Sequence, residues 1–211
     1  MKSASPTEAA AALNRLDDFV DWRPRLWSPA VRWLLGDPER FTGRRVLDLG
    51  CRYGKMSCLF GLLGAEVLGI DTDAAAIPRA EAERDRWSLG RSVEFAHYGG
   101  DLDELDRSFD FVFTKSVLVV VPELPELLRG VAARLAPDGE LLAVENAAGG
   151  PVLDFVRRHV VHREWRGVAH KLHGVNDRFW DAFPRTLEVV DQRSFWRLVT
   201  AFRARRCEVS S

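Results

Sequence analysis

The chain has 211 residues, enough for one α/β domain with a full hydrophobic core. Its formal net charge of −1 gives no strong positive field, which disfavours a nucleic-acid or membrane-surface partner. Cys51, Cys58 and Cys207 show neither metal-site spacing nor a disulfide framework, as expected in a reducing cytoplasm. There is no apolar run of membrane-spanning length and no signal-peptide core in residues 1–6, so we expect a cytoplasmic protein without a membrane partner.

Two helices are predicted before the first strand. Residues 7–20 place apolar side chains on one helical face, and residues 29–35 begin with a proline that suits a first helical position. Between them lies an aromatic and basic segment. Its residues Trp22, Arg25 and Trp27 either contact a substrate or pack on the surface of the domain.

The most informative stretch, residues 44–71, predicts a strand, a glycine turn, a helix and a second strand that ends on an acid. Residues 46–49 are a compact apolar run, which suits a strand buried on both faces. Residues 55–63 place apolar side chains on one helical face, and residues 67–70 form the next apolar strand. Such a unit also occurs without a ligand, so the motif alone leaves that alternative open.

Two classes of cofactor are bound by a unit of this kind. The glycine turn lets a ligand approach the backbone, and an acid at Asp71 can accept hydrogen bonds from ribose hydroxyls. Dinucleotide enzymes use Gly-x-Gly-x-x-Gly against a pyrophosphate. Here Asp48 precedes the first glycine, Gly50, and a carboxylate there repels a pyrophosphate but accepts hydrogen bonds from an ammonium group.

Residues 44–71 resemble motif I of the class I S-adenosylmethionine-dependent methyltransferases, and Asp71 resembles the ribose-binding acid of that family. The resemblance implies that the following residues contact S-adenosylmethionine: Asp48, Gly50, Cys51, Arg52, Gly54, Asp71 and Thr72. Arg52 stands where the family has its middle glycine. Its side chain must therefore point away from the cofactor or contact it.

The next two elements lead to a second part of the expected cofactor site. Residues 73–87 predict a helix, and residues 92–96 predict a short third strand. Gly100-Asp101 follows this strand, where the family commonly has Gly-Asp with the acid at the adenine amino group. The resemblance thus places Asp101 and Leu102 at the adenine, with a turn or helix cap as the alternative for Asp101.

Residues 109–114 and 140–145 predict the fourth and fifth strands, separated by a helix over residues 125–135 and a turn over residues 136–139. The stretch leading into the fifth strand resembles the corresponding part of the family. The Asp/Asn-Pro-Pro-aromatic motif of enzymes that methylate the exocyclic amino groups of bases is absent after the fourth strand. This absence argues against such chemistry.

Ligands of open α/β sheets lie beyond the C-terminal ends of the strands. We therefore expect Lys115 at the cofactor, and Ser116 and Asn146 at the acceptor. Metal-dependent catechol-type methyltransferases need carboxylates at both strand ends to bind magnesium. Lys115 stands where the first of these carboxylates would be, so we expect no metal.

The stretch over about residues 147–185 has no clean period and is expected to be a substrate-region insertion. It contains His170 and His173, whose His-x-x-His spacing suits one helical face. No cysteine or flanking pattern supports a zinc site. We interpret one of the two as a general base at the acceptor, with solvated or capping histidines as the alternative.

The end of the chain predicts a helix over residues 194–202 and a last strand over residues 204–209, with residues 186–190 as the one candidate for a seventh strand. The expected fold is α/β: a doubly wound, mostly parallel sheet with helices on both faces. N-terminal lid helices over residues 1–40 precede a Rossmann-like methyltransferase domain over residues 41–211.

The function implied by the resemblance is S-adenosylmethionine-dependent methyl transfer, by in-line displacement, to a hydroxyl or amine of a small molecule. Positioning and exclusion of water supply most of the catalysis, because the sulfonium methyl is intrinsically reactive. An RNA-modifying methyltransferase and a non-catalytic S-adenosylmethionine-binding module are the alternatives. The near-neutral charge disfavours the first, and the sequence does not indicate the oligomeric state.

Overall fold

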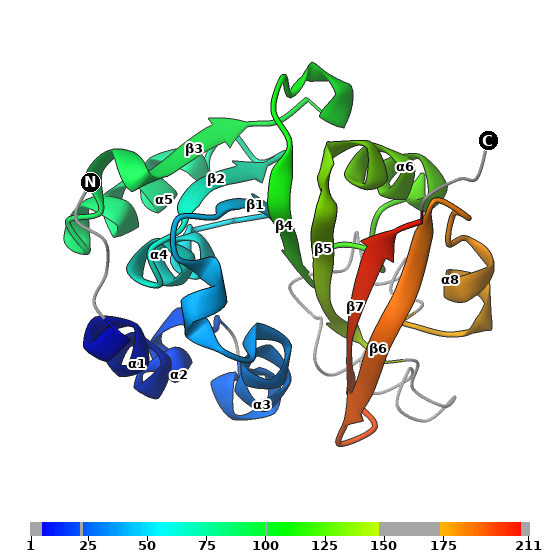
Figure 1. Ribbon diagram of the computed structural model, residues 1–211, viewed down its shortest axis with the longest axis horizontal. Coiled ribbons are helices and arrows are strands. Elements are labelled where there is room, and N and C mark those ends of the chain that lie inside the picture. The colour runs from blue at the N-terminus through cyan, green and yellow to red at the C-terminus, as the bar shows by residue number, and fades with distance from the viewer. Residues whose placement is uncertain (1–5, 22, 100, 148–173, 208–211) are drawn as a thin grey trace.

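A seven-stranded sheet forms the centre of the computed structural model, which describes residues 6–21, 23–99, 101–147 and 174–207 (Figure 1). The strands are β1 (Arg45–Leu49), β2 (Glu66–Asp71), β3 (Val93–His97), β4 (Phe109–Lys115), β5 (Leu135–Asn146), β6 (Leu187–Phe195) and β7 (Val199–Arg206). Their order is β3-β2-β1-β4-β5-β7-β6. The first five pair in parallel, and β7 is antiparallel to both of its neighbours. The expected doubly wound, mostly parallel sheet is confirmed.

Helices cover both faces of this sheet (Figure 1). The α-helices are α1 (Pro6–Asn14), α2 (Leu16–Phe19), α3 (Pro24–Leu35), α4 (Lys55–Leu62), α5 (Ile77–Arg86), α6 (Leu124–Arg134) and α8 (Asp177–Asp181). Helices α1 to α4 share a core with one face, where the rings of Phe60 and Phe113 lie 5.2 Å apart. Helices α6 and α8 cover the other face, and Phe179 packs on Phe202 at 5.9 Å. In the described part of the chain, no helix is both long and apolar enough to cross a membrane.

The central strands are apolar because helices cover both of their faces. In β1, every residue after Arg45 is buried, which agrees with the apolar run in the sequence. Each of the strands β1, β2 and β4 ends at the same edge of the sheet, where Leu49, Asp71 and Lys115 mark the last positions. The polar residues that follow these strands are therefore brought together.

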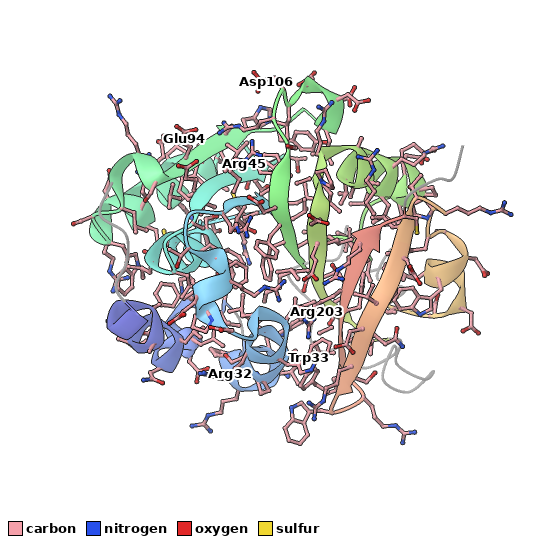
Figure 2. The ribbon with its side chains drawn as sticks, viewed as in Figure 1. Arg32, Trp33, Arg45, Glu94, Asp106 and Arg203 are labelled. Carbon is pink, nitrogen blue, oxygen red and sulfur yellow. The ribbon has the colours of Figure 1, made fainter. Side chains whose placement is uncertain are left out.

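Helix α3 packs on the antiparallel end of the sheet. Trp33 of α3 and Arg203 of β7 face each other (Figure 2), with the guanidinium carbon 5.2 Å from the ring centroid. The same arginine pairs with Asp191 of β6 at 3.3 Å, and the Trp33 ring contacts Phe195 at 6.2 Å. This packing joins residues that are more than 150 positions apart in the sequence.

Two predicted helix boundaries near the N-terminus are wrong. The single helix expected over residues 7–20 is divided into α1 and α2, with Arg15 between them. Helix α3 begins at Pro24 and not at Pro29, which lies inside it. Pro24 takes the first-turn position, where a missing N–H costs no helical hydrogen bond.

The helix after β2 also starts later than the sequence suggests. Asp73, the first residue of the expected helix, lies in the preceding turn, where its Oδ1 accepts a hydrogen bond from the N–H of Ala75 at 2.9 Å. Helix α5 begins at Ile77, with Pro78 in its first turn. A proline in the first turn removes no intrahelical hydrogen bond, whereas one further along would. The helix therefore begins just before Pro78.

The predicted helix over residues 194–202 is wrong. This stretch holds the end of β6, a turn at Trp196 and Arg197, and the start of β7. Three residues, 196–198, connect the strands, and Trp196 and Arg197 both have φ +55°, in the left-handed region that tight hairpin turns use. The hairpin is stabilised by long-range pairing of β7 with β5, which local periodicity does not report.

The observed bounds of the last strands also differ from those expected from the sequence. The candidate strand at residues 186–190 is confirmed as part of β6, and the last strand begins at residue 199 instead of 204. The turn expected at residues 136–139 lies within β5, where the register against β4 shifts between Phe109 and Phe111. Most of the substrate-region insertion expected over about residues 147–185 lies outside the described residues.

Candidate functional site

A cavity of about 1380 Å³ opens at the C-terminal ends of the parallel strands. Nine of the ten residues expected to contact the cofactor line it: Asp48, Gly50, Cys51, Arg52, Asp71, Thr72, Asp101, Leu102 and Lys115. Four segments far apart in the sequence, at the C-terminal ends of β1, β2 and β4 and after β3, thus form one wall. The tenth residue, Gly54, is not part of the wall.

The turn after β1 needs glycine at two positions for different reasons. Gly50 has φ +78°, and a Cβ there would collide with the side chain of Val117. Gly54 has φ +74°, and a Cβ would meet Phe95 Cζ at 2.5 Å and Ala80. The first glycine therefore lets the loop after β4 approach the turn, and the second lets α4, α5 and β3 pack together.

Asp71 is held by two backbone amides. Its Oδ2 accepts a hydrogen bond from the N–H of Arg52 at 2.7 Å, and its Oδ1 accepts one from the N–H of Asp73 at 2.9 Å. Each oxygen keeps a lone pair for a further donor. The carboxylate is therefore oriented in the cavity wall and able to accept bonds from a pair of hydroxyl groups.

Arg52 keeps the backbone conformation of the glycine that it replaces. Its φ is +48°, in the left-handed region. Its guanidinium carbon lies 4.7 Å from the ring centroid of Tyr53, and that of Arg79 lies 5.1 Å from the same ring. The Arg52 side chain thus stacks on a tyrosine of the cavity wall while its backbone amide holds Asp71.

Asp48 lies at the floor of the cavity, with 2% of its surface exposed. Burial raises its pKa to about 7, the nearby charge of Asp71 acts in the same direction, and a hydrogen bond from Ser57 opposes them. That bond joins Ser57 Oγ to Asp48 Oδ2 at 2.5 Å. A cationic group bound beside Asp48 would favour its carboxylate form.

Glu145, near the end of β5, is fully buried and holds the loop after β4. Its Oε1 accepts hydrogen bonds from the N–H groups of Val117 and Leu118 at 3.1 and 3.0 Å. Its Oε2 is buried without a hydrogen-bond partner among the described residues. Burial raises the pKa of Glu145 to about 7, against the effect of these amides. The sequence places Glu145 at the end of the fifth strand but assigns it no role in the site.

Lys115 is the last residue of β4, and its Nζ lies 4.7 Å from the ring centroid of Trp27. Burial lowers the pKa of Lys115, while the charges of Asp21 and Glu145 oppose that shift. Trp27, expected at the substrate, is 1% exposed and lies in the core beneath this lysine, not in the cavity wall. Its indole fills the space between α3 and the sheet.

The remaining predicted acceptor residues are dispersed. Ser116 lines the cavity, with φ +60°. Asn146 ends β5 outside the cavity wall, and its carbonyl accepts a hydrogen bond from the N–H of Val175 at 2.8 Å. Arg25 is exposed on α3, also outside the wall. Trp22, His170 and His173 lie outside the described residues.

The cavity wall also contains residues that the sequence did not indicate. Phe19 and Asp21, from the end of α2 and the link to α3, line it. Asp21 pairs with Lys55 at the start of α4, with 2.9 Å between Oδ1 and Nζ. No motif marks this contact, because it depends on how the N-terminal helices pack on α4.

The charges of the wall fit a cationic ligand. Its carboxylates are Asp21, Asp48, Asp71, Asp73, Asp101, Asp103, Glu123 and Glu126. Its basic residues are Arg52, Lys55, Lys115 and Arg129. S-adenosylmethionine carries an ammonium and a sulfonium group, so the excess of carboxylates in the wall suits it. Among the described residues, no group of three His, Cys, Asp or Glu side chains is arranged to bind a metal ion.

The strand order, the glycine turn after β1 and the acid at the end of β2 define a class I S-adenosylmethionine-dependent methyltransferase. A family model described as a methyltransferase domain matches residues 19–193, and the chain belongs to this family. S-adenosylmethionine is the cofactor of this class of methyltransferase.

Two curated relatives match about half of the chain in sequence. It is 31% identical over 113 residues to a ubiquinone biosynthesis O-methyltransferase of Pseudomonas syringae pv. tomato, covering 53% of this chain and 47% of that protein. It is 32% identical over 117 residues to a ribosomal RNA small subunit methyltransferase C of Chromohalobacter salexigens, covering 54% and 34%. The chain thus spans about half or less of the length of these relatives.

Solved structures show the same fold over most of the chain. The magnesium protoporphyrin IX methyltransferase of Synechocystis PCC 6803, with bound SAH, has a TM-score of 0.64 and 17% identity, covering 94% of this chain and 96% of that one. An S-adenosylmethionine-dependent methyltransferase from Mesorhizobium loti has a TM-score of 0.66 and 19% identity, covering 86% and 98%. At these identities the likeness is one of fold.

Proposed function

We propose that the enzyme transfers a methyl group from S-adenosylmethionine to a hydroxyl or amine of a small molecule. The observation that carries this proposal is the cavity at the strand ends, in which the acids of the cofactor site continue into an apolar region lined by Val117, Val120, Val121 and Leu127. A space with apolar walls and few polar groups suits a small organic acceptor. The similarity to ubiquinone biosynthesis O-methyltransferases supports a hydroxyl acceptor.

The cofactor roles follow from the positions of the acids. We assign the ribose hydroxyls to Asp71, the adenine to Asp101 and Leu102, and the ammonium group to Asp48. We expect the other predicted cofactor residues of the wall, which lie in the turn after β1 and at the ends of β2 and β4, to contact the cofactor as well. They are Gly50, Cys51, Arg52, Thr72 and Lys115. Gly54 supports the turn by packing.

When bound, S-adenosylmethionine would supply the methyl carbon of its sulfonium group to an acceptor oxygen or nitrogen in line with the carbon–sulfur bond, which breaks to release S-adenosylhomocysteine. The chain binds and orients both partners and excludes water. We place Ser116, at the end of β4, beside the transferred methyl group. A base is required only if the acceptor is a hydroxyl or a protonated amine, and His170 or His173 is our candidate.

The N-terminal segment is proposed to act as a lid over this site. Phe19 and Asp21 already form part of the cavity wall, and the ion pair of Asp21 with Lys55 joins the segment to α4. Residues 1–40 would thus form the lid, and residues 41–211 the methyltransferase domain. Trp22 and Arg25 follow Asp21 closely in the sequence, which keeps them as candidates at the acceptor.

A second function, methylation of RNA, is favoured by the similarity to a ribosomal RNA methyltransferase. Transfer of labelled methyl groups to a panel of phenols, aliphatic amines, bulk tRNA and ribosomal RNA separates the two. We expect labelling of a phenol or amine and not of RNA. Labelling of RNA alone would overturn the proposal. Binding of S-adenosylhomocysteine without transfer to any member of the panel would favour a non-catalytic binding module.

The histidine proposal has its own test, which uses a variant with both His170 and His173 replaced by alanine. We expect turnover to fall by roughly two to four decades, as is typical for loss of a general base. S-adenosylhomocysteine affinity, measured by calorimetry, should remain unchanged. Full turnover in this variant would remove both histidines from catalysis.

A further inference from the structure

The cavity wall contains four basic side chains, three of which have close partners in the structure: Arg52, Lys55 and Arg129. Lys55 pairs with Asp21 at 2.9 Å, and Arg129 pairs with Glu126 at 2.6 Å. The guanidinium of Arg52 stacks on a neighbouring tyrosine. Each of these three cations therefore has a protein partner in the absence of a ligand.

The fourth, Lys115, has a different environment. Its Nζ lies over the buried ring of Trp27, and it forms no ion pair with a carboxylate of the described residues. Asp21, Glu145 and Asp48 act on it only through longer-range charge interactions, and Arg52 opposes them. The Lys115 side chain is half-buried, and an anion that approached its ammonium group would offset the loss of hydration. Lys115 lines the cavity, so an anionic group of a ligand can reach it.

The position of Lys115 indicates which end of the ligand it meets. Asp48 and the turn after β1 lie at the same end of the cavity as Lys115, because β1 and β4 are neighbouring parallel strands in which Leu49 pairs with Thr114, the residue before Lys115. Helix α4 also starts there, at Lys55, and directs its positive end toward the turn. This end therefore places the carboxylate of Asp48 and the ammonium group of Lys115 on adjacent strands, a pair complementary to the α-ammonium and α-carboxylate groups of a free amino acid.

We propose that Lys115 binds the α-carboxylate of the methionine moiety of the cofactor, while Asp48 faces the α-ammonium group. The proposal rests on the proposed function, in which Asp71 and Asp101 hold the adenosine part. Lys115 would thus bind the amino acid end of the cofactor. This role would account for a lysine that packs over a buried tryptophan at the end of β4.

The test compares two ligands that differ in the amino acid moiety. S-adenosylhomocysteine carries the α-carboxylate, whereas 5′-methylthioadenosine has the same nucleoside and sulfur without it. The variant Lys115→Met removes the charge and keeps a long apolar stem over Trp27. By calorimetry we expect S-adenosylhomocysteine to bind at least about tenfold more weakly, and 5′-methylthioadenosine to change by less than about twofold.

The matched control is Arg79→Met, which removes a cation on α5 that lies outside the cavity wall, 5.1 Å from the ring centroid of Tyr53. We expect it to leave both affinities unchanged, since Arg79 is not among the residues that line the cavity. If this control weakens S-adenosylhomocysteine as much as Lys115→Met does, the effect is one of general charge, and the proposal fails. If Lys115→Met does not fold, Lys115→Gln takes its place, with folding checked by circular dichroism.

Two further results would overturn the proposal. Equal weakening of both ligands would mean that Lys115 supports the shape of the cavity, and no weakening of either would place the carboxylate elsewhere. The proposed function fails separately: an enzyme that binds S-adenosylhomocysteine in a Lys115-dependent way but methylates no small molecule would lose its proposed acceptor and keep this role for Lys115. A wild-type protein that bound neither ligand would remove both.

Discussion

Oδ2 of Asp71 accepts a hydrogen bond from the backbone N–H of Arg52 across 2.7 Å. The two residues follow adjacent parallel strands, since Asp71 ends β2 and Arg52 lies in the turn after β1. The bond orients the acid in the cavity wall and satisfies an amide in a left-handed turn. The arginine in place of the family's glycine thus leaves this backbone contact intact.

Replacing this acid tests the ribose assignment. In Asp71→Ala the ribose hydroxyls lose charge-assisted hydrogen bonds worth roughly 1.5–3 kcal/mol each, so S-adenosylhomocysteine should bind at least tenfold more weakly. Asp73→Asn is the control, because it removes a neighbouring charge and keeps an oxygen for the N–H of Ala75. Calorimetry that shows equal affinity for Asp71→Ala and wild type would place the ribose elsewhere.

Thermal stability can distinguish binding of S-adenosylmethionine-type ligands from binding of a dinucleotide. A ligand that binds the native state raises the melting temperature by mass action. S-adenosylhomocysteine should therefore raise it in a dye-based thermal-shift assay, and NAD should not, because Asp48 would repel its pyrophosphate. The reverse pattern would contradict the cofactor site described above.

The close approach of Val117 to the turn after β1 predicts a strong effect of one methyl group. Gly50→Ala adds a Cβ at φ +78° that collides with the side chain of Val117. Gly43→Ala is the control, since Gly43 has φ +68° and no atom within 4 Å of the added Cβ. Guanidinium denaturation should show a loss of about 1–2 kcal/mol for Gly43→Ala, the cost of the conformation alone. Gly50→Ala should lose more and also bind S-adenosylhomocysteine more weakly; equal losses would mean that Val117 moves freely.

Glu145 predicts a pH dependence of stability. Burial raises its pKa from 4.5 to about 7, so the folded state holds its proton more tightly than the unfolded state does. Its contribution to stability is complete below pH 4.5 and is lost as the pH rises through about 7. Glu145→Gln keeps an oxygen for the amides of Val117 and Leu118 but has no charge to bury. Denaturation at several pH values should show the variant gaining on wild type as the pH rises from about 5 to about 8.

The comparison with the variant isolates this group, because Asp48, which has a similarly raised pKa, is present in both proteins. Parallel stability curves over this range would contradict the shift at Glu145. A variant that loses stability at every pH would instead mean that the amide does not replace the carboxylate in the loop.

Lys115 predicts a reaction that does not depend on a metal. It stands at the end of β4, where metal-dependent catechol-type enzymes need a carboxylate for magnesium. Methyl transfer to any acceptor found in the panel should therefore continue in EDTA, and the thermal shift with S-adenosylhomocysteine should also remain. Loss of activity that magnesium restores would show this prediction to be wrong.

Local pattern was sufficient for the parallel half of the fold. The apolar runs of β1, β2 and β4 are buried on both faces, and such strands are recognisable within a few residues. The positions of Asp71 and Lys115 at strand ends also follow from the sequence, because parallel strands bring their C-terminal ends to one edge. Nine predicted cofactor residues line one cavity for this reason.

Local pattern failed where a segment has no stable conformation by itself. Residues 194–202 have apolar spacing that suits a helix, yet they form a hairpin because β7 pairs with β5. Pro29 looked like a helix start, but the helix began at Pro24, where a first-turn proline is equally suitable. In both places two conformations have similar local preference, and long-range contacts select one.

The amino-acid sequence by itself determined the sheet's central strands, the glycine turn and the class of cofactor, because these depend on short-range periodicity and on the chemistry of a few adjacent residues. Only the tertiary structure decided that Glu145 holds the amides of Val117 and Leu118, that Asp21 pairs with Lys55, and that Trp27 lies beneath Lys115. The physical reason is distance along the chain. These contacts join segments whose approach is set by how helices and strands pack, and the free energy of that packing is shared by the whole core.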